Sequence, residues 1–267
     1  MTVESATAII NQLLPEPHAG LLAGIVFGTR ATLAKELTDA LITTGTLHII
    51  ALSGMNITIM TGLVESILRP LISRRLAILI TIVLIIMFIV FVGPSPSIIR
   101  AGIMGCIGLI AISSGRQQWS LWALALAIIG MLVLYPPWLT DLSFQLSVLA
   151  TLGIILFGTR QIGEGVKSAL WRLIEPNLRL TLAAQVFTIP LIFLHFHRIS
   201  MISPLANILI GWTIAPLTIL GWLVATGGWV WIPLGRIAAW VSWVFLEYLI
   251  GTISVLTRIP LASVGFY

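Results

Sequence analysis

The sequence is poor in charged residues. Only 9% of its 267 residues are Asp, Glu, Lys or Arg, whereas soluble domains carry roughly 25% because their surfaces face water. The 14 Lys and Arg together with 9 Asp and Glu cannot cover a water-facing surface of this size. This shortage excludes a soluble globular domain and makes lipid the solvent for most of the surface. The net charge of +5 then reflects basic residues between membrane spans rather than a nucleic-acid footprint.

Motifs that carry chemistry are also scarce. The single cysteine, Cys106, excludes an internal disulfide and a thiolate metal cluster. The sequence contains neither a P-loop nor a His-x-His-x-Asp-His metal motif, so we expect no ATPase, nuclease or other enzyme in this chain, and no metal or cofactor. The N-terminus lacks a basic segment, so we expect no cleavable signal peptide, and its abrupt start indicates a chain cut from a longer protein.

Long apolar runs are what the sequence does contain. Apolar residues make up 58% of the chain, and a helix needs roughly 20 residues to cross the hydrocarbon. The runs predict an all-α fold, a polytopic transmembrane helical bundle of about eight spans. We expect the seventh run to be a broken helix near Pro216, because proline removes a backbone donor. The predicted spans are residues 47–68, 76–92, 96–113, 119–135, 139–158, 178–196, 201–230 and 235–257.

The first 46 residues have a different pattern. Val3, Ala6 and Ile10 lie on one stripe, which predicts a short amphipathic helix at the membrane interface. Residues 19–44 combine a short apolar run with charged residues, so they are expected to form membrane-surface helices or a partial re-entrant insertion. We therefore divide the chain into interfacial helices at 1–46 and a transmembrane channel domain at 47–267, which together form one structural unit.

The basic residues predict the orientation. Loops after the first, third and fifth predicted spans carry Lys and Arg, whereas loops after the second and fourth carry none. Cytoplasmic loops are enriched in these residues, so we expect a multi-pass protein of the cytoplasmic membrane with both termini outside. The basic residues concerned are Arg69, Arg74, Arg75, Arg116, Arg160, Lys167 and Arg172.

Polar side chains inside the predicted spans are the candidate functional residues, because polar groups are costly in hydrocarbon. The first span carries His48, Ser53 and Asn56. At about 100° per residue, Asn56 lies about 80° and Ser53 about 140° from His48, so one broad helix face holds all three. Two interpretations stay open: hydrogen bonds between helices, at about 0.6 kcal/mol each, or a water-lined cavity.

The third span begins with a cation in an unfavourable place. Ser97 is predicted to cap this helix, and Arg100 lies one turn later, near the positive end of the helix dipole. Arg100 therefore needs an anion: a carboxylate, a lipid headgroup or a translocated phosphate. Asp141, at the start of the fifth span, is the candidate partner, and Gln145 shares its helix face.

Three further polar residues complete the candidate set: Ser147, Gln185 and Asn207. Gln185 precedes Pro190 by five residues and Asn207 follows a proline by three, so backbone groups freed by proline are alternative partners for both side chains. Glu247 is the other acid within a predicted span, and the sequence offers no obvious partner for it.

Several of these segments together resemble the competence domain of the ComEC family of DNA-uptake proteins. The segment His48-Ile-Ile-Ala-Leu-Ser53-Gly54-Met-Asn56 resembles the H-x-x-A-x-S-G motif of that family. Further blocks follow in the family's order at residues 97–101, 135–147 and 185–207, so the resemblance covers nearly the whole chain.

The resemblance implies a membrane channel that conducts single-stranded DNA across the cytoplasmic membrane during natural transformation. It implies as partners single-stranded DNA, the lipid bilayer, a DNA receptor on the outer side, a cytoplasmic ATPase or DNA-binding protein, and a separate nuclease. This sequence contains neither the OB-fold-like nor the metallo-β-lactamase-like domain that family members often add. The expected channel-lining or DNA-contacting residues are His48, Ser53, Asn56, Ser97, Arg100, Asp141, Gln145, Ser147, Gln185 and Asn207.

Two other functions remain as alternatives. A break near Pro216 and a pair between Arg100 and Asp141 fit a secondary transporter of a small solute, although no inverted repeat is visible. An intramembrane serine protease is the other alternative, because Ser53 followed by glycine resembles the nucleophile context of rhomboid-like enzymes. His195 or His197 would then serve as the base.

Overall fold

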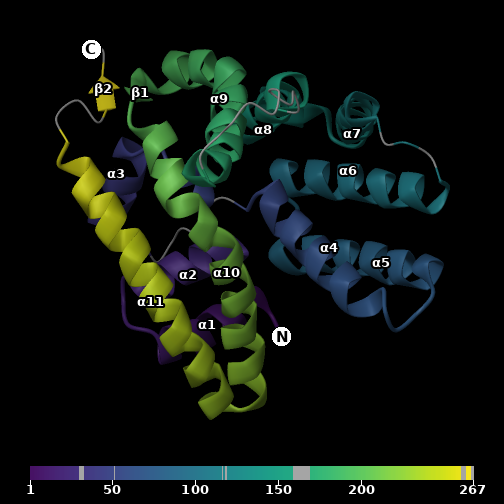
Figure 1. Ribbon diagram of the computed structural model, residues 1–267, viewed down its shortest axis with the longest axis horizontal. Coiled ribbons are helices and arrows are strands. Elements are labelled where there is room, and N and C mark those ends of the chain that lie inside the picture. The colour runs from purple at the N-terminus through teal and green to yellow at the C-terminus, as the bar shows by residue number, and fades with distance from the viewer. Residues whose placement is uncertain are drawn as a thin grey trace. The chain divides into compact units, whose positions relative to one another are not determined.

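The computed structural model describes residues 1–29, 33–50, 52–115, 117, 119–158, 169–259 and 263–265. These residues are overwhelmingly helical, which confirms the predicted all-α class (Figure 1). The α-helices in chain order are α1 (Val3–Leu13), α2 (His18–Phe27), α3 (Lys35–Thr43), α4 (Gly54–Leu68), α5 (Arg74–Val92), α6 (Pro96–Ser113), α7 (Ser120–Leu134), α8 (Leu142–Gly153), α9 (Ala169–Phe196), α10 (Ser203–Val230) and α11 (Ile232–Thr257). Shorter helical turns are η1 (Leu47–Ile49), η2 (Pro136–Thr140) and η3 (Ile154–Gly158).

The chain divides into two compact units. Unit 1 combines Met1–Ala51 with Gly153–Tyr267, and unit 2 is the intervening Leu52–Leu152. Unit 1 is therefore assembled from the two ends of the sequence, and unit 2 is inserted between them. This division differs in kind from the expected one into residues 1–46 and 47–267, and each unit has its own packing.

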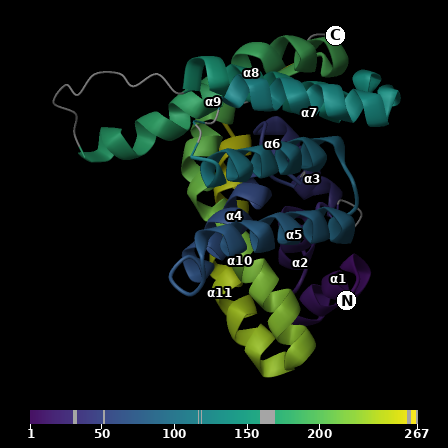
Figure 2. The same cartoon turned by 90° about the vertical axis from the view of Figure 1, so that its right-hand side faces the viewer.

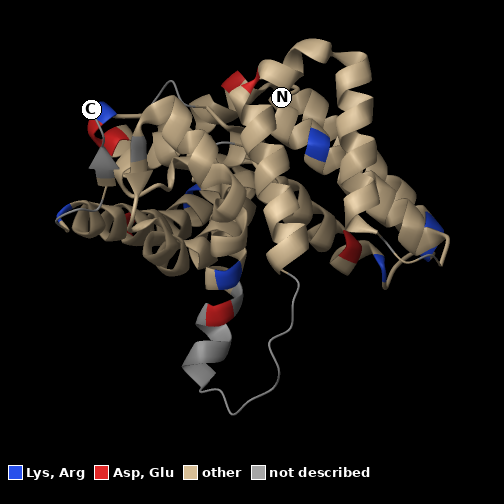
Figure 3. Ribbon diagram, turned by 90° about the horizontal axis from the view of Figure 1, so that it is seen from above, with Lys and Arg blue, Asp and Glu red and all other residues tan. Residues whose placement is uncertain are grey.

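Five helical segments are long and apolar enough to cross a membrane: α5, α6, residues 177–196 of α9, α10 and α11. Four shorter apolar helices accompany them, at α2, α4, α7 and residues 142–158. Each of the eight predicted spans contains one described helix, but three of these helices are shorter than a full span. Charged residues are sparse along the ribbon, most of which is tan (Figure 3).

The long hairpin of α10 and α11 forms the centre of unit 1, and the two helices lie side by side (Figure 1). They approach closely near the turn, where a Cβ atom on Gly235 would lie 2.6 Å from the Cα of Gly228. Helix α1 packs against the same region, because a Cβ on Gly228 would meet the Ile9 side chain. Ala6 and Ile10 of α1 are fully buried, as the predicted apolar stripe requires.

Helix α2 is more enclosed than a helix lying on a membrane surface, which is one of the two alternatives expected for residues 19–44. Every residue of α2 is buried, and the helix contacts α1, α10 and α11. Its sequence, HAGLLAGIVF, is apolar on all sides, and a helix of that kind is stable only when surrounded. Helix α3 has the expected two-sided character, with Leu37 and Leu41 buried and its charged residues outward.

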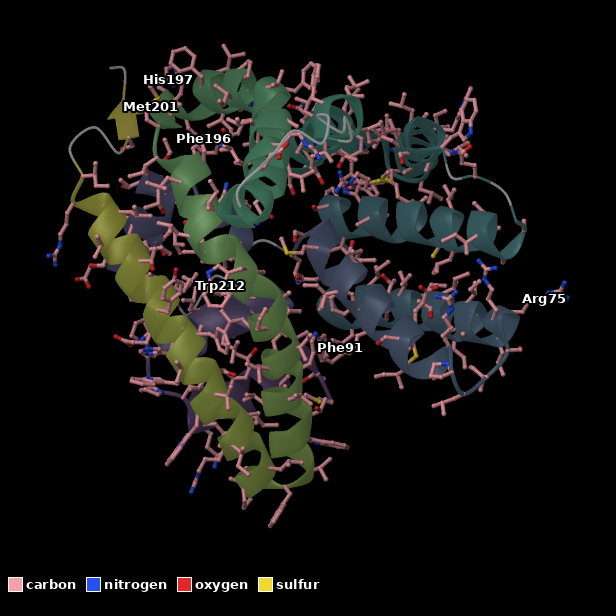
Figure 4. All side chains as sticks on the ribbon, viewed as in Figure 1. Arg75, Phe91, Phe196, His197, Met201 and Trp212 are labelled. Carbon is pink, nitrogen blue, oxygen red and sulfur yellow. The ribbon has the colours of Figure 1, made fainter. Side chains whose placement is uncertain are left out.

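The predicted break near Pro216 is not observed. Helix α10 runs without interruption from Ser203 to Val230 with Pro216 inside it. Helix α11 packs along α10, and proline is tolerated in such helices when neighbouring helices compensate for the lost hydrogen bond. Trp212, labelled in Figure 4, contributes to this packing, with ring contacts to Phe245 at 5.9 Å and Tyr248 at 5.4 Å.

Unit 2 is organised around α6, which contacts α4, α5 and α7. Helices α5 and α6 run side by side in both views (Figures 1 and 2). Helix α5 presents exposed apolar side chains at Leu79, Val83, Ile86 and Val90, a helix-period face suited to lipid. Arg75 at its first turn is exposed and projects away from the ribbon (Figure 4).

A short antiparallel strand pair was not predicted. Strand β1 (Arg198–Ser200) pairs with β2 (Ser263–Gly265), with Ile199 opposite Val264. Strand β1 connects α9 to α10, and strand β2 follows α11. The strand pair therefore joins the ends of three helices of unit 1. Of the basic residues used to predict orientation, Arg116, Arg160 and Lys167 lie outside the described residues, as does the Arg172 side chain.

Candidate functional site

Arg100 is the centre of a polar cluster in unit 2. Its side chain is only 8% exposed, and one guanidinium nitrogen, Nη1, donates a hydrogen bond to the carbonyl oxygen of Ser147 in α8. A Cβ on Gly54 would lie 3.6 Å from Nη2 of Arg100 and 3.2 Å from the Cβ of Ala101. Three sequence blocks that are far apart along the chain therefore meet around one guanidinium group.

The charge of this guanidinium is not compensated within the described part of unit 2. Its Nε atom is buried and has no hydrogen-bond partner among the described residues. Among the described residues no carboxylate forms an ion pair with Arg100, and the Asp141 carboxylate contacts the Phe144 N–H instead. The group also sits in the first turns of α6, where the helix dipole disfavours a cation. A buried, uncompensated cation of this kind is set up to receive an anion.

Ser97 does not cap α6 as predicted. The helix already begins at Pro96, so Ser97 lies inside the first turn, and its hydroxyl is 2.9 Å from the hydroxyl of Ser147. The predicted cap position is shifted because proline at the first helical position is favourable and needs no donor there. Ser147 thus bonds the Ser97 hydroxyl through its side chain and Arg100 through its carbonyl, which ties α8 to α6.

The predicted pair between Arg100 and Asp141 is not formed. The Asp141 carboxylate instead accepts the backbone N–H of Phe144 at 2.8 Å, which is the N-cap interaction of α8. Gln145 donates from Nε2 to the carbonyl oxygen of Leu139 at 2.9 Å, which stabilises the same helix start. These local hydrogen bonds prevail because the turn η2, which begins at Pro136, ends directly before α8. The turn therefore brings Asp141 and Leu139 close to the first residues of that helix.

Replacing Asp141 tests this capping assignment. Asp141→Ala is expected to lower stability by about 1 kcal/mol, because it leaves a helix N–H without its cap, whereas Asp141→Asn keeps an acceptor and most of the stability. Thermal unfolding of the purified protein in detergent measures both. Equal losses in the two variants would show that the negative charge, rather than the cap, is what Asp141 supplies.

His48, Ser53 and Asn56 do not share one helix face, contrary to the prediction. Helix α4 begins at Gly54 with Ser53 as its N-cap, whose hydroxyl oxygen accepts the Met55 N–H at 3.3 Å. His48 belongs to the separate turn η1, and the boundary between the units falls between it and Ser53. Asn56 is buried in the first turn of α4. The serine cap makes the helix begin at Gly54, later than the start at residue 47 that the apolar pattern predicts.

A second polar cluster lies in unit 1. Gln185 of α9 donates from Nε2 to the hydroxyl of Ser203 at 3.1 Å, at the start of α10. Gly45 lies directly against this point, because a Cβ there would meet the Ser203 Cβ at 2.8 Å, and its φ of +67° favours glycine. His48 reaches the carbonyl oxygen of Gly45 through Nδ1 at 3.1 Å. Asn207 follows Ser203 by one turn and is half-buried.

The ten predicted residues thus separate into two groups. Unit 2 holds Ser53, Asn56, Ser97, Arg100, Asp141, Gln145 and Ser147, whereas unit 1 holds His48, Gln185 and Asn207. Sequence reasoning missed Gly45 and Ser203, and it missed that His18 lies 2.7 Å from Glu247. A small residue next to the serine side chains of another segment leaves no periodic signal, so Gly45 could not have been found. His18 could have been noticed as the only polar side chain of an otherwise apolar helix.

These features define the class of protein: an α-helical integral membrane protein with polar side chains buried among apolar helices. The chain belongs to the competence protein family, whose model matches residues 25–266. It is 30% identical over 200 residues to ComE operon protein 3 of Bacillus subtilis (strain 168), covering 74% of this chain and 25% of that protein. It is 25% identical over 209 residues to the uncharacterized protein YcaI of Escherichia coli (strain K12), covering 74% of this chain and 27% of that one.

The chain spans about a quarter of the length of these curated relatives. The matching region includes the membrane helices of both units, since the family match runs from within α2 to the end of β2. No solved structure matches the chain.

Proposed function

We propose that this chain is the membrane-spanning part of a DNA-uptake apparatus and conducts single-stranded DNA across the cytoplasmic membrane during natural transformation. The observation that carries the proposal is Arg100, a buried cation whose Nε has no partner among the described residues. Membership of the competence family supports DNA as the cargo. In this proposal Arg100 contacts a backbone phosphate, and the ten polar residues named above line the path or contact the strand.

The physical requirements of conduction agree with this composition. A nucleic-acid strand carries one negative charge per phosphate, so its passage needs a polar, hydrated path through the hydrocarbon. Serine, asparagine and glutamine side chains provide hydrogen bonds without strong retention. A few cations recruit phosphates, whereas many would hold the strand through counterion release and stall it. The buried guanidinium of Arg100, the one buried arginine in the described part of unit 2, fits a path that attracts the strand and lets it leave.

The proposal includes an orientation and partners. The basic residues Arg69 and Arg116, which follow α4 and α6 in the sequence, support an orientation in which those loops are cytoplasmic and both termini are outside. A DNA receptor would deliver the strand from outside, and a cytoplasmic ATPase or DNA-binding protein would supply the driving force. A separate nuclease would remove the complementary strand, since we propose no enzymatic activity for this chain.

Transport of labelled single-stranded DNA tests the function. Cells that lack the gene are expected to bind added DNA at their surface but accumulate no label in the cytoplasm, and the restored gene recovers accumulation. The control is uptake of a small solute such as an amino acid, which is expected to be equal in both strains. Cytoplasmic label in the deletion strain would contradict the proposal.

The two alternatives have lost their supporting observations. The transporter reading relied on a broken helix at Pro216 and on a pair between Arg100 and Asp141, and the structure contains neither. The protease reading relied on Ser53 followed by glycine, with His195 or His197 as base, whereas the Ser53 oxygen serves as the N-cap of α4. Conduction of DNA is therefore the function that the geometry supports best.

A further inference from the structure

Glu247 lies where an acidic side chain is most costly. Helix α11 is flanked by Arg236 near its start and Arg258 just beyond its end, and Glu247 is equidistant from them. At 1.5 Å per residue, each arginine is about 16 Å away along the helix, so the flanking charges put Glu247 at the middle of the hydrocarbon. Its side chain is nevertheless 56% exposed. An ionised carboxylate at this depth is strongly disfavoured unless it is neutralised.

His18 supplies the neutralising contact. Its Nε2 atom is 2.7 Å from Oε2 of Glu247, and its side chain is only 10% exposed. The imidazole stacks on Trp243, one turn before Glu247, with ring centroids 5.7 Å apart. Its second nitrogen, Nδ1, is buried and has no partner among the described residues. The ring is therefore held in place by packing, and its one polar contact is the carboxylate.

Other ionisable groups near this pair do not replace either partner. Helix α10 carries no charged residue, and His18 is the ionisable residue of α2. Glu16 precedes His18 by two residues, but its carboxylate accepts the Gly20 N–H at 3.1 Å. The remaining groups on helices that contact α11 belong to α1 and α3, and none is within ion-pair distance of His18 or Glu247: Glu4, Lys35, Glu36 and Asp39.

We propose that His18 and Glu247 form a proton-binding site at mid-membrane depth. The pair is electrically neutral when it holds one shared proton, whether as imidazolium with carboxylate or as imidazole with carboxylic acid. Loss of that proton leaves a net negative charge in the hydrocarbon, and gain of a second leaves a net positive charge. The shared proton belongs to the pair as a whole, and it exchanges because a histidine is one of the two partners.

An open groove on the α10–α11 face gives access to this site. The groove has a volume of about 390 Å³ and is lined by Glu247 together with Leu209, Tyr248, Gly251 and Val255. Its lining is mainly apolar, and a Cβ on Gly251 would meet nothing within 4 Å. An apolar reagent in the membrane can therefore reach the carboxyl group, which makes the proton measurable.

Dicyclohexylcarbodiimide, an apolar reagent that adds to protonated carboxyl groups, tests the site in the protein reconstituted into liposomes. Mass spectrometry is expected to find the adduct at Glu247, with labelling that falls as pH rises. Glu65 of unit 2 serves as the internal comparison and is expected to remain unlabelled. Absence of an adduct at Glu247 at every pH would overturn the proposal.

Two variants separate the roles of the partners. Glu247→Gln keeps a hydrogen-bond acceptor for His18 and is expected to abolish the adduct. His18→Gln removes the imidazole that contacts the carboxyl group of Glu247, so labelling of Glu247 at one fixed pH is expected to increase severalfold. Unchanged labelling of Glu247 in a folded His18→Gln protein would overturn the pairing.

A spectroscopic measurement covers the case in which His18→Gln fails to fold. The infrared difference spectrum between wild type and Glu247→Gln at low pH is expected to contain the C=O stretch of a protonated carboxyl group, which declines as pH rises. A difference spectrum without that band at any pH contradicts the proposal. None of these measurements involves DNA, so their outcome is independent of the proposed function.

Discussion

Arg100→Ala is expected to reduce cytoplasmic accumulation of labelled DNA by about 10- to 100-fold while the protein still inserts. The estimate follows from one lost charge-assisted hydrogen bond, worth about 1.5–3 kcal/mol, to each phosphate that passes the guanidinium. Arg100→Lys keeps the charge but loses the planar fork of donors, so its uptake is expected to lie between those of wild type and Arg100→Ala. The measurement is label recovered from the cytoplasm, normalised to the amount of protein in the membrane.

Arg75→Ala is the matched control. Arg75 is exposed at the first turn of α5 and points away from the helices of unit 2 (Figure 4), so its removal deletes the same charge without touching the cluster. Normal transformation by the Arg100→Ala protein would contradict the assignment of Arg100 to the DNA path.

The same variants distinguish a DNA phosphate from a lipid phosphate as the anion. If Arg100 contacts the strand, its loss lowers the slope of log affinity for single-stranded DNA against log salt by about 0.7. If a lipid headgroup occupies the site instead, that slope is unchanged and the amount of copurified anionic lipid falls. The second outcome would remove the main support for the proposed function.

Gly235→Ala is expected to destabilise the protein more than Asp141→Ala does. The added Cβ would lie 2.6 Å from the Cα and 2.7 Å from the backbone nitrogen of Gly228, so α10 and α11 would have to separate. Overpacking of this kind costs about 1–3 kcal/mol, which corresponds to a drop in Tm of roughly 2–10 °C. Thermal unfolding in detergent measures the change.

Gly251→Ala on the same helix is the control for Gly235→Ala. A Cβ at position 251 meets nothing within 4 Å, and alanine is a better helix former than glycine by about 1 kcal/mol. Its Tm is therefore expected to stay the same or rise. A Gly235→Ala protein as stable as wild type would show that the two helices can separate at the turn without cost.

The helices of the fold were predictable because each one leaves a local signal. Apolar runs and their proline and glycine boundaries located α5, α6 and α11 within a few residues. The burial of α2 was not predicted, since a ten-residue apolar segment fits a surface insertion as well as a core helix until its neighbours are known. The continuity of α10 was missed because the loss of a hydrogen bond at Pro216 is a local cost, whereas the packing that offsets it comes from α11.

The candidate site was predictable in its residue types but not in its pairings. Arg100 was identified from its depth and its place near a helix start, and its burial agrees with that reasoning. Its contact with a carbonyl in α8 could not be predicted, because backbone acceptors carry no sequence signal. Asp141 was paired with Arg100 because the two opposite charges lie near the outer ends of their predicted spans, whereas a carboxylate at a helix start also has a backbone N–H within reach.

The discontinuous make-up of unit 1 sets an order of events during synthesis. Helix α2 is buried by α10 and α11, which emerge from the ribosome only after all of unit 2 has been made. At roughly 5–20 residues per second, α2 waits about 10–35 s for α10. Throughout that interval an apolar helix too short to span the bilayer must be sheltered by lipid or by an insertion factor. Premature truncation before Ser203 therefore leaves α2 without its neighbours, and such fragments are expected to be degraded rather than retained.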